Sequence, residues 1–352
     1  MASNAQFDKN LEVPTSLGRD DIRLYNAAEA PFTLHGLFYD NGVFARVPAA
    51  VAETVSEGVA HHARNAAGGR TRFKTNSPFV AIVAKMPFIG RMPHFALTGS
   101  SGFALYIDGL FMKTFIPPYD MKDGYESLLE LPIERGPGKM HDVTIVWPTY
   151  SAVSSLYVGV QECAEVLPPD PYKVDKPVVF YGSSITQGGC STQPGNTYED
   201  ILSRWLDMDY INLGFSGNAK GEPEMVEYIN NLDMSVLVMD YDHNAPSAEH
   251  LQATHEPMYK AIRERHPDLP IIMISMPKHV TSPWTEERKA IIKATYQHAV
   301  DAGDKNVYFI DGCEFYKDRG EDSCTVDHTH PNDLGFMAMA LGIRPVLEPL
   351  VK

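Results

Sequence analysis

The sequence lacks the features that would indicate an export signal, a membrane protein or a nucleic-acid-binding protein. It has no run of about 18 apolar residues, and its start, MASNAQFDKN, has no basic segment followed by an apolar one. Basic residues are few, with 30 Lys and Arg against 45 Asp and Glu and a formal net charge of −15. Such a surface repels phosphate backbones and anionic lipids. We therefore expect a cytoplasmic chain that binds neither nucleic acid nor membrane.

Cysteine is also scarce, and no pair has the CxxC spacing of a redox or zinc motif. Disulfide frameworks belong to small secreted domains, whereas this chain has 352 residues. We expect free thiols at all four positions, which are Cys163, Cys190, Cys313 and Cys324.

The chain changes character near its middle. Residues 32–160 contain short apolar segments such as RTRFKT and FVAIVAK, in which side chains alternate with the period of half-buried strands. Residues 164–177, AEVLPPDPYKVDKP, are rich in proline and acidic residues and show no apolar periodicity. The sequence predicts a β-sandwich domain over residues 1–167, jelly-roll-like and a candidate for carbohydrate binding, followed by a second domain over residues 168–352.

The second domain alternates apolar strands with amphipathic helices. Strands such as PVVFYG, MSVLVMDYD and LPIIMISMP are nearly all apolar, which is typical of a parallel sheet covered on both faces. This pattern predicts a doubly wound α/β domain. In such domains ligands bind beyond the carboxyl ends of the strands, so the residues just after each strand are candidate site residues.

The strand ends carry the groups needed for acyl transfer. A serine nucleophile requires a base, the base requires an orienting acceptor, and the oxyanion requires N–H donors. Ser184 can act as the nucleophile, His330 as the base and Asp327 as the acceptor that orients it. Gly217 can offer a backbone N–H and Asn244 a side-chain N–H. The competing role for Asn244 is to cap a helix that starts near Pro246.

Four sequence blocks, GSSIT, NLGFSGN, DHNA and DHTHPND, resemble in order and spacing those of the SGNH or GDSL-type esterases and acylhydrolases. The resemblance implies a triad of Ser184, Asp327 and His330, and an oxyanion hole made by Ser184, Gly217 and Asn244, with no cofactor or metal. Two departures concern the oxyanion turn: Ser183 replaces the usual Asp before the nucleophile, and Asp242 to Ala245 replace the usual Gly-x-Asn-Asp.

The preceding β domain gives the whole chain a resemblance to two-domain bacterial carbohydrate esterases. This resemblance implies a serine esterase that removes O-acetyl groups from oligosaccharides of plant mannan or xylan through an acyl-enzyme. The expected partner is therefore an acetylated oligosaccharide, and a homo-oligomer is compatible with the sequence. Four residues near the strand ends are candidates for substrate contacts: Tyr241, Lys278, His279 and Trp284. The competing role of Trp284 is to anchor the start of a helix.

Two other functions are compatible with parts of the sequence. A metal-dependent hydrolase would need an N/O ligand set, and the candidates are Asp240, Asp242, His243, Asp327, His328 and His330. No HExxH or other paired ligand spacing supports this alternative. A non-catalytic carbohydrate-binding protein would be expected to lack a nucleophile or a base, and neither is missing here.

Overall fold

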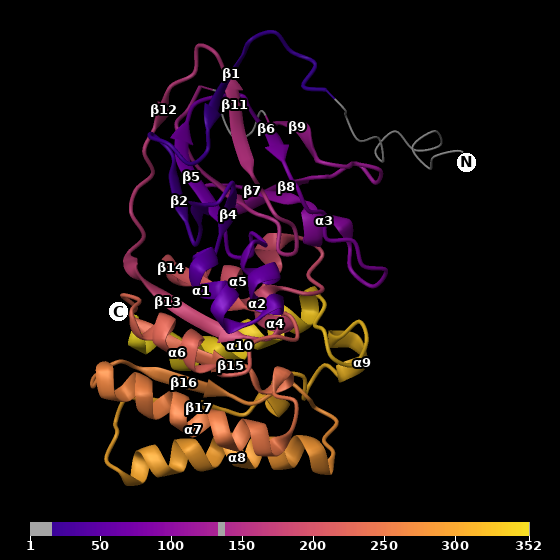
Figure 1. Ribbon diagram of the computed structural model, residues 1–352. Coiled ribbons are helices and arrows are strands. Elements are labelled where there is room, and N and C mark those ends of the chain that lie inside the picture. Colours follow the sequence, from indigo (N-terminus) through magenta and orange to yellow (C-terminus); the bar gives the residue numbers. More distant parts are fainter. Residues whose placement is uncertain (1–15, 133–137, 352) are drawn as a thin grey trace.

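The computed structural model describes residues 16–132 and 138–351, which form a β-rich N-terminal region and a C-terminal α/β region (Figure 1). Strand β12 (Val166–Leu167) is the last strand of the first region, and β13 (Val174–Gly182) is the first strand of the second. The predicted fold class is confirmed, because an antiparallel β-rich region precedes a parallel α/β domain.

The described part of the N-terminal region contains two larger antiparallel sheets and a two-stranded antiparallel sheet of β3 and β4. One larger sheet has the strand order β1-β11-β6-β9, and the other has the order β12-β5-β10-β7-β8 with β2 beside β5. Both larger sheets supply side chains to one core around the buried Trp147, including Phe73 from one sheet and Ile82 from the other. The strand bounds are β1 Ile22–Asn26, β2 Thr33–His35, β3 Phe38–Asp40, β4 Val43–Ala45, β5 Arg70–Thr75, β6 Phe79–Lys85, β7 Phe103–Ile107, β8 Leu110–Phe115, β9 Gly124–Glu130, β10 His141–Val146 and β11 Ser155–Gln161.

Within the described residues of the N-terminal region, three short helices lie between the strands, and the sequence pattern did not predict them. They are α1 (Ala49–Val55), α2 (Glu57–Ala63) and α3 (Leu97–Ser101). Helices α1 and α2 pack against the C-terminal domain, since Ala52 and Val59 belong to the same hydrophobic core as Val179 of β13. The first region therefore covers part of the second, and the two share a core.

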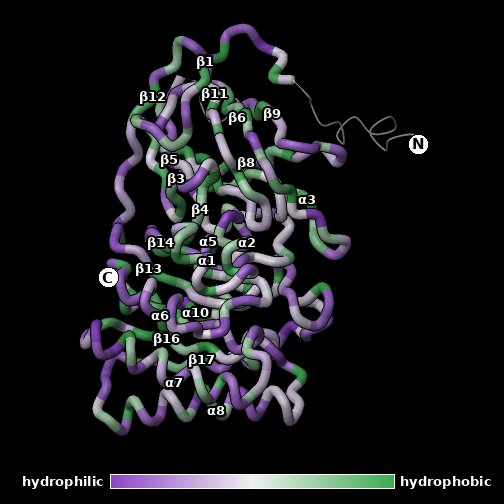
Figure 2. Tube along the Cα trace, viewed as in Figure 1, coloured by the Kyte–Doolittle hydropathy of each residue, from purple (hydrophilic) through white to green (hydrophobic). Residues whose placement is uncertain are grey.

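The C-terminal sheet has the order β14-β13-β15-β16-β17, with all neighbours parallel. Val179 and Tyr181 of β13 face one core, while Val178 and Phe180 face the other, so helices cover both sides. Figure 2 shows hydrophobic strands at the centre and mixed hydropathy along the outer helices α7 and α8. The other bounds are β14 Met208–Gly214, β15 Val236–Asp240, β16 Ile271–Ile274, β17 Val307–Ile310, α4 Ser184–Gln187, α5 Tyr198–Leu206, α6 Pro223–Asn230, α7 Ala248–Arg265, α8 Pro283–Asp301, α9 Glu321–Cys324 and α10 Asp333–Leu347.

Arg46 joins the two regions. Its guanidinium group is buried and donates to the carbonyl groups of Asn65 at 3.0 Å and Gly214 at 2.6 Å, and to Oδ1 of Asn212 at 3.1 Å. A buried cation is tolerated only when its donors are satisfied, and these acceptors lie on both sides of the boundary. Arg46 thus fixes the N-terminal region against β14, close to the carboxyl ends of the strands.

Among the described helices, none is long and apolar enough to span a bilayer.

Candidate active site

The two serines that follow β13 have different surroundings. The strand ends at Gly182, where an added Cβ would lie 2.0 Å from Oγ1 of Thr186. Ser183 is the N-cap of α4, and its hydroxyl accepts a hydrogen bond from the N–H of Ile185 at 3.2 Å. Oγ of Ser184 instead lies 2.9 Å from Nε2 of His330. The sequence GSS therefore ends the strand, caps the helix and presents one hydroxyl to a histidine.

Asp327 holds this histidine from its other side. Oδ2 of Asp327 lies 2.8 Å from Nδ1 of His330, while Oδ1 accepts the backbone N–H of His330 at 2.8 Å and of Thr329 at 3.1 Å. Partial burial alone would raise the pKa of Asp327, but the hydrogen bonds from the backbone and ring of His330 outweigh it and lower the pKa to about 2. The carboxylate is ionised at neutral pH and fixes Nδ1 as the protonated nitrogen.

The three N–H groups predicted to form the oxyanion hole belong to Ser184, Gly217 and Asn244. Gly217 has a φ of +69°, and an added Cβ there would meet nothing within 4 Å, so the backbone beside its N–H is open. Within the described part of the chain, the N–H groups of Ser184 and Gly217 have no acceptor. Nδ2 of Asn244 donates one hydrogen to the carbonyl of Phe215 at 2.8 Å, which leaves its second hydrogen for a ligand.

The structure assigns the helix cap to another residue. The N-cap of α7 is Ser247, whose hydroxyl accepts the N–H of His250 at 3.2 Å. Asn244 lies in the short 3₁₀ turn Asp242–Asn244, which is held by Arg288 through hydrogen bonds of 2.5 Å to the carbonyl groups of Asp242 and Ala245. The competing role of Asn244 as a helix cap therefore finds no support in the structure.

The four candidate substrate residues lie in different environments. Tyr241 is 1% exposed and its hydroxyl pairs with Thr254 at 3.1 Å, so it cannot reach a ligand in this conformation and its assignment is corrected. His279 is exposed. Trp284 is 46% exposed, and the guanidinium of Arg288 stacks on its ring at 4.4 Å. This contact makes Trp284 an anchor of α8, although nearly half of the side chain remains exposed to solvent.

Lys278 supports the loop that carries the histidine. Its ammonium group pairs with the buried carboxylate of Glu321 and donates to the carbonyl of His328. The second oxygen of Glu321 accepts the N–H of Val280 at 3.0 Å. The buried ion pair links the loop after β16 to the segment Asp327–His330. We therefore interpret Lys278 as a positioning residue for His330.

Replacing Lys278 by methionine should lower kcat by about 10- to 100-fold, because a displacement of about 1 Å in a reacting group can cost that much. In Lys278→Met the buried carboxylate of Glu321 loses its cation, which can also destabilise the fold. The double variant Lys278→Met/Glu321→Gln removes this unpaired charge, so a loss of kcat that remains in it reports on the position of His330. Steady-state kinetics with thermal melting provide the measurement, and Lys278→Arg should recover most of the rate. Exposed Lys317 pairs with Glu314 at 3.0 Å, and Lys317→Met is the matched control. Wild-type kcat in the double variant would contradict this role.

The N-terminal region brings further residues next to Ser184 and His330, and the sequence pattern did not indicate them. The hydroxyl of Tyr150 donates to the carbonyl of Ser184 at 3.2 Å, and the ring centroids of His94 and His330 are 5.7 Å apart. Helix α3 is pressed against the loop after α4, since a Cβ at Gly99 would lie 1.9 Å from the carbonyl oxygen of Ser191. No sequence signal marks His94, because its position depends on how the two regions dock.

The ligand set considered for a metal-dependent hydrolase does not assemble. Both Oγ1 of Thr186 and the hydroxyl of Tyr198 bond Oδ2 of Asp240 at 3.2 Å, and Oδ2 of Asp242 accepts the N–H of Met276 at 2.9 Å. Burial raises the pKa of Asp242 to about 7 and lowers that of His243 to about 3. Over residues 16–132 and 138–351, the only group of three candidate ligands is formed by His94, Cys190 and His330.

A doubly wound domain that presents a hydrogen-bonded serine, histidine and aspartate at the carboxyl edge of its sheet is the arrangement expected of a serine hydrolase. Residues 175–348 match the GDSL-like lipase/acylhydrolase family, and residues 22–166 match the N-terminus of SGNH-hydrolase-type esterases. The α/β region therefore belongs to the GDSL-like lipase/acylhydrolase family, a family of carboxylic ester hydrolases.

Solved structures share the arrangement of both regions. A candidate GDSL-like lipase from Bacteroides ovatus is 28% identical with a TM-score of 0.82, over 94% of this chain and 98% of that one. A salicylyl acyltransferase from a tetracycline biosynthetic pathway is 19% identical with a TM-score of 0.77, over the same shares of the two chains. A family two carbohydrate esterase from Cellvibrio japonicus is 12% identical with a TM-score of 0.60, also over 94% and 98%. The last two show the fold alone. No curated protein sequence matches the chain.

Proposed function

We propose that this protein is a serine esterase that removes acetyl groups from the hydroxyls of oligosaccharides derived from plant mannan or xylan. The observation that carries the proposal is the hydrogen-bond chain from Oγ of Ser184 to Nε2 of His330 at 2.9 Å and from Nδ1 of His330 to Asp327 at 2.8 Å. These contacts support the roles of Ser184 as nucleophile, His330 as base and Asp327 as orienting carboxylate.

In the proposed reaction, Oγ of Ser184 attacks the carbonyl carbon of the acetyl ester while its proton passes to Nε2 of His330. The N–H groups of Ser184, Gly217 and Asn244 stabilise the negative charge that develops on the carbonyl oxygen. The imidazolium then gives its proton to the departing sugar oxygen, which leaves the acetyl group on Ser184. Water, deprotonated by His330, hydrolyses this acetyl-enzyme to acetate. Asp327 stays ionised throughout and stabilises the imidazolium.

Three observations support a neutral, acetylated sugar as the substrate. The formal net charge of −15 disfavours polyanionic ligands. The exposed part of Trp284 offers an indole surface on which a sugar ring can stack. Carbohydrate esterases of family two, including the Cellvibrio japonicus protein, share this two-region architecture.

The free state of all four cysteines supports our further proposal that the enzyme works in a reducing compartment, the cytoplasm.

The alternatives are less well supported by the site. A metal-dependent hydrolase would need the Asp240 and Asp242 carboxylates as ligands, and one oxygen of each already accepts hydrogen bonds within the protein. A binding protein without activity has no need for the aligned contacts of Ser184, His330 and Asp327.

Acyl-chain and acceptor preference test the proposed substrate. We expect acetate release from acetylated manno- or xylo-oligosaccharides, and a kcat/KM for nitrophenyl acetate at least about tenfold above that for nitrophenyl octanoate. The reason is that an acetyl group needs little apolar contact surface, whereas an octanoyl chain gains binding energy only where a site offers an extended apolar surface. The Ser184→Ala variant measures the background. Faster cleavage of octanoate would refute the deacetylase assignment while leaving the serine mechanism in place.

A further inference from the structure

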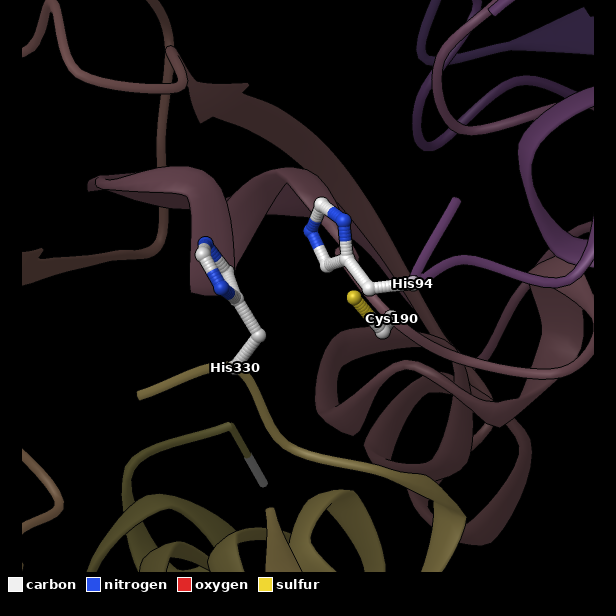
Figure 3. Close-up of side chains that lie close together, drawn as sticks. All are labelled: His94, Cys190 and His330. Carbon is white, nitrogen blue, oxygen red and sulfur yellow. The ribbon is translucent and has the colours of Figure 1, made fainter. Parts of the chain in front are cut away.

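His94, Cys190 and His330 lie together at the junction of the two regions, although they come from three separate segments of the chain (Figure 3). Each side chain offers one nitrogen or sulfur ligand atom, and these atoms all lie within 4.8 Å of one another. His94 is exposed, His330 is half-buried and Cys190 is buried beside Phe95 and Tyr150. The proposed triad uses His330 but not the other two residues.

This donor set matches the chemistry of a zinc-like cation. Two imidazole nitrogens and one sulfur are borderline-to-soft ligands, which suit Zn²⁺ and Co²⁺ and do not suit Mg²⁺ or Ca²⁺. With Zn–N bonds of about 2.0–2.1 Å and a Zn–S bond of about 2.3 Å, tetrahedral ligand atoms lie about 3.3–3.6 Å apart. The side chain of His94 is exposed and can rotate to close the remaining gap. Three protein ligands leave a fourth position for water.

The nitrogen of His330 that a cation can take is Nε2, because Nδ1 is held by Asp327 at 2.8 Å. Nε2 is also the atom that pairs with Oγ of Ser184 at 2.9 Å. The Asp327–His330 pair is already arranged like the carboxylate–histidine pairs that orient metal ligands in zinc sites. A cation bound here therefore competes directly with Ser184 for its base.

We propose that His94, Cys190 and His330 form an inhibitory site for a zinc-like divalent cation, which binds Nε2 of His330 and switches the esterase off. The Cys190 thiol loses its proton to solvent as the S–metal bond forms, and no oxidation is involved. The inhibition rests on the proposed function, since it acts by withdrawing the proposed general base. The binding site itself rests only on the three side chains.

Cobalt spectroscopy tests the site without reference to activity. Titrating the full-length protein with Co²⁺ should produce a thiolate-to-cobalt charge-transfer band in the near ultraviolet, and Zn²⁺ should displace it. Cys190→Ser should abolish the band, whereas Cys163→Ser and Cys313→Ser, at other free thiols, should retain it. A band that survives in Cys190→Ser, or no band in the wild type, would overturn the site even if the protein is an active esterase.

Zinc inhibition tests the consequence. Hydrolysis of nitrophenyl acetate should be inhibited by Zn²⁺, and EDTA should restore it; Mg²⁺ should have no effect. For each protein, inhibition is expressed relative to the rate of that protein without metal. On this scale, the half-inhibitory zinc concentration of His94→Gln should be at least about tenfold higher than that of the wild type. His298→Gln, at an exposed histidine of α8, is the matched control and should leave inhibition unchanged. Equal sensitivity of His94→Gln and the wild type would overturn the proposal. If no esterase activity is found at all, the cobalt spectrum still decides whether the site exists.

Discussion

Ser184→Ala is expected to lower kcat/KM for an acetyl ester by about 10⁴- to 10⁶-fold, because removing the nucleophile of a serine hydrolase removes the function of the whole triad. His330→Ala should cause a loss of similar size, and the double variant should lose little more, since the two groups act as a unit. Asp327→Ala should retain more activity. Steady-state kinetics on nitrophenyl acetate provide the measurement.

The neighbouring serine provides the control for this experiment. Ser183 and Ser184 are both buried, but the hydroxyl of Ser183 caps α4 through the N–H of Ile185 and does not face His330. Ser183→Ala should cost about 1 kcal/mol of stability, as the loss of a helix cap typically does, and should keep most of the activity. Wild-type turnover in Ser184→Ala would refute the mechanism, and equal losses in both variants would indicate a general disturbance of the turn.

The carboxyl edge of the parallel sheet could be predicted from the sequence because it depends on local patterns. Nearly continuous apolar strands indicated the sheet, and the rule that ligands bind beyond the strand ends selected Ser184 and the turn around Asn244. Asp327 and His330 are three residues apart, so a single turn brings both side chains to one side. The departure at Ser183 also has a local explanation, since a serine caps α4 where the related blocks have an aspartate.

The contribution of the N-terminal region could not be predicted in the same way. Helices α1 and α2 are short and alanine-rich, and their burial depends on a core that is completed by β13, more than a hundred residues later in the chain. His94 reaches His330 only because the two regions dock through contacts such as those of Arg46 with Asn212 and Gly214. Tyr241 was misassigned because a strand end does not reveal which way a side chain points; here the ring turns into the core.

Asn244→Ala is expected to lower kcat by about 100- to 1,000-fold with little change in KM, as the loss of one oxyanion donor typically does. The reason is that Nδ2 donates only one of its hydrogens within the described structure, to Phe215, and the other is available to the developing oxyanion. The melting temperature should change little, because α7 is capped by Ser247. Turnover and thermal melting should be measured on the same preparation.

Ser247→Ala is the matched control for the oxyanion donor, three residues further along the same turn. It removes the hydroxyl that accepts the N–H of His250, so it should cost about 1 kcal/mol of stability while kcat stays close to the wild-type value. The two variants should therefore show opposite patterns, with activity lost at Asn244 and stability lost at Ser247. If Asn244→Ala instead melts earlier and keeps its kcat, the side chain acts only through its hydrogen bond to Phe215, and the oxyanion must be stabilised by the N–H groups of Ser184 and Gly217 alone.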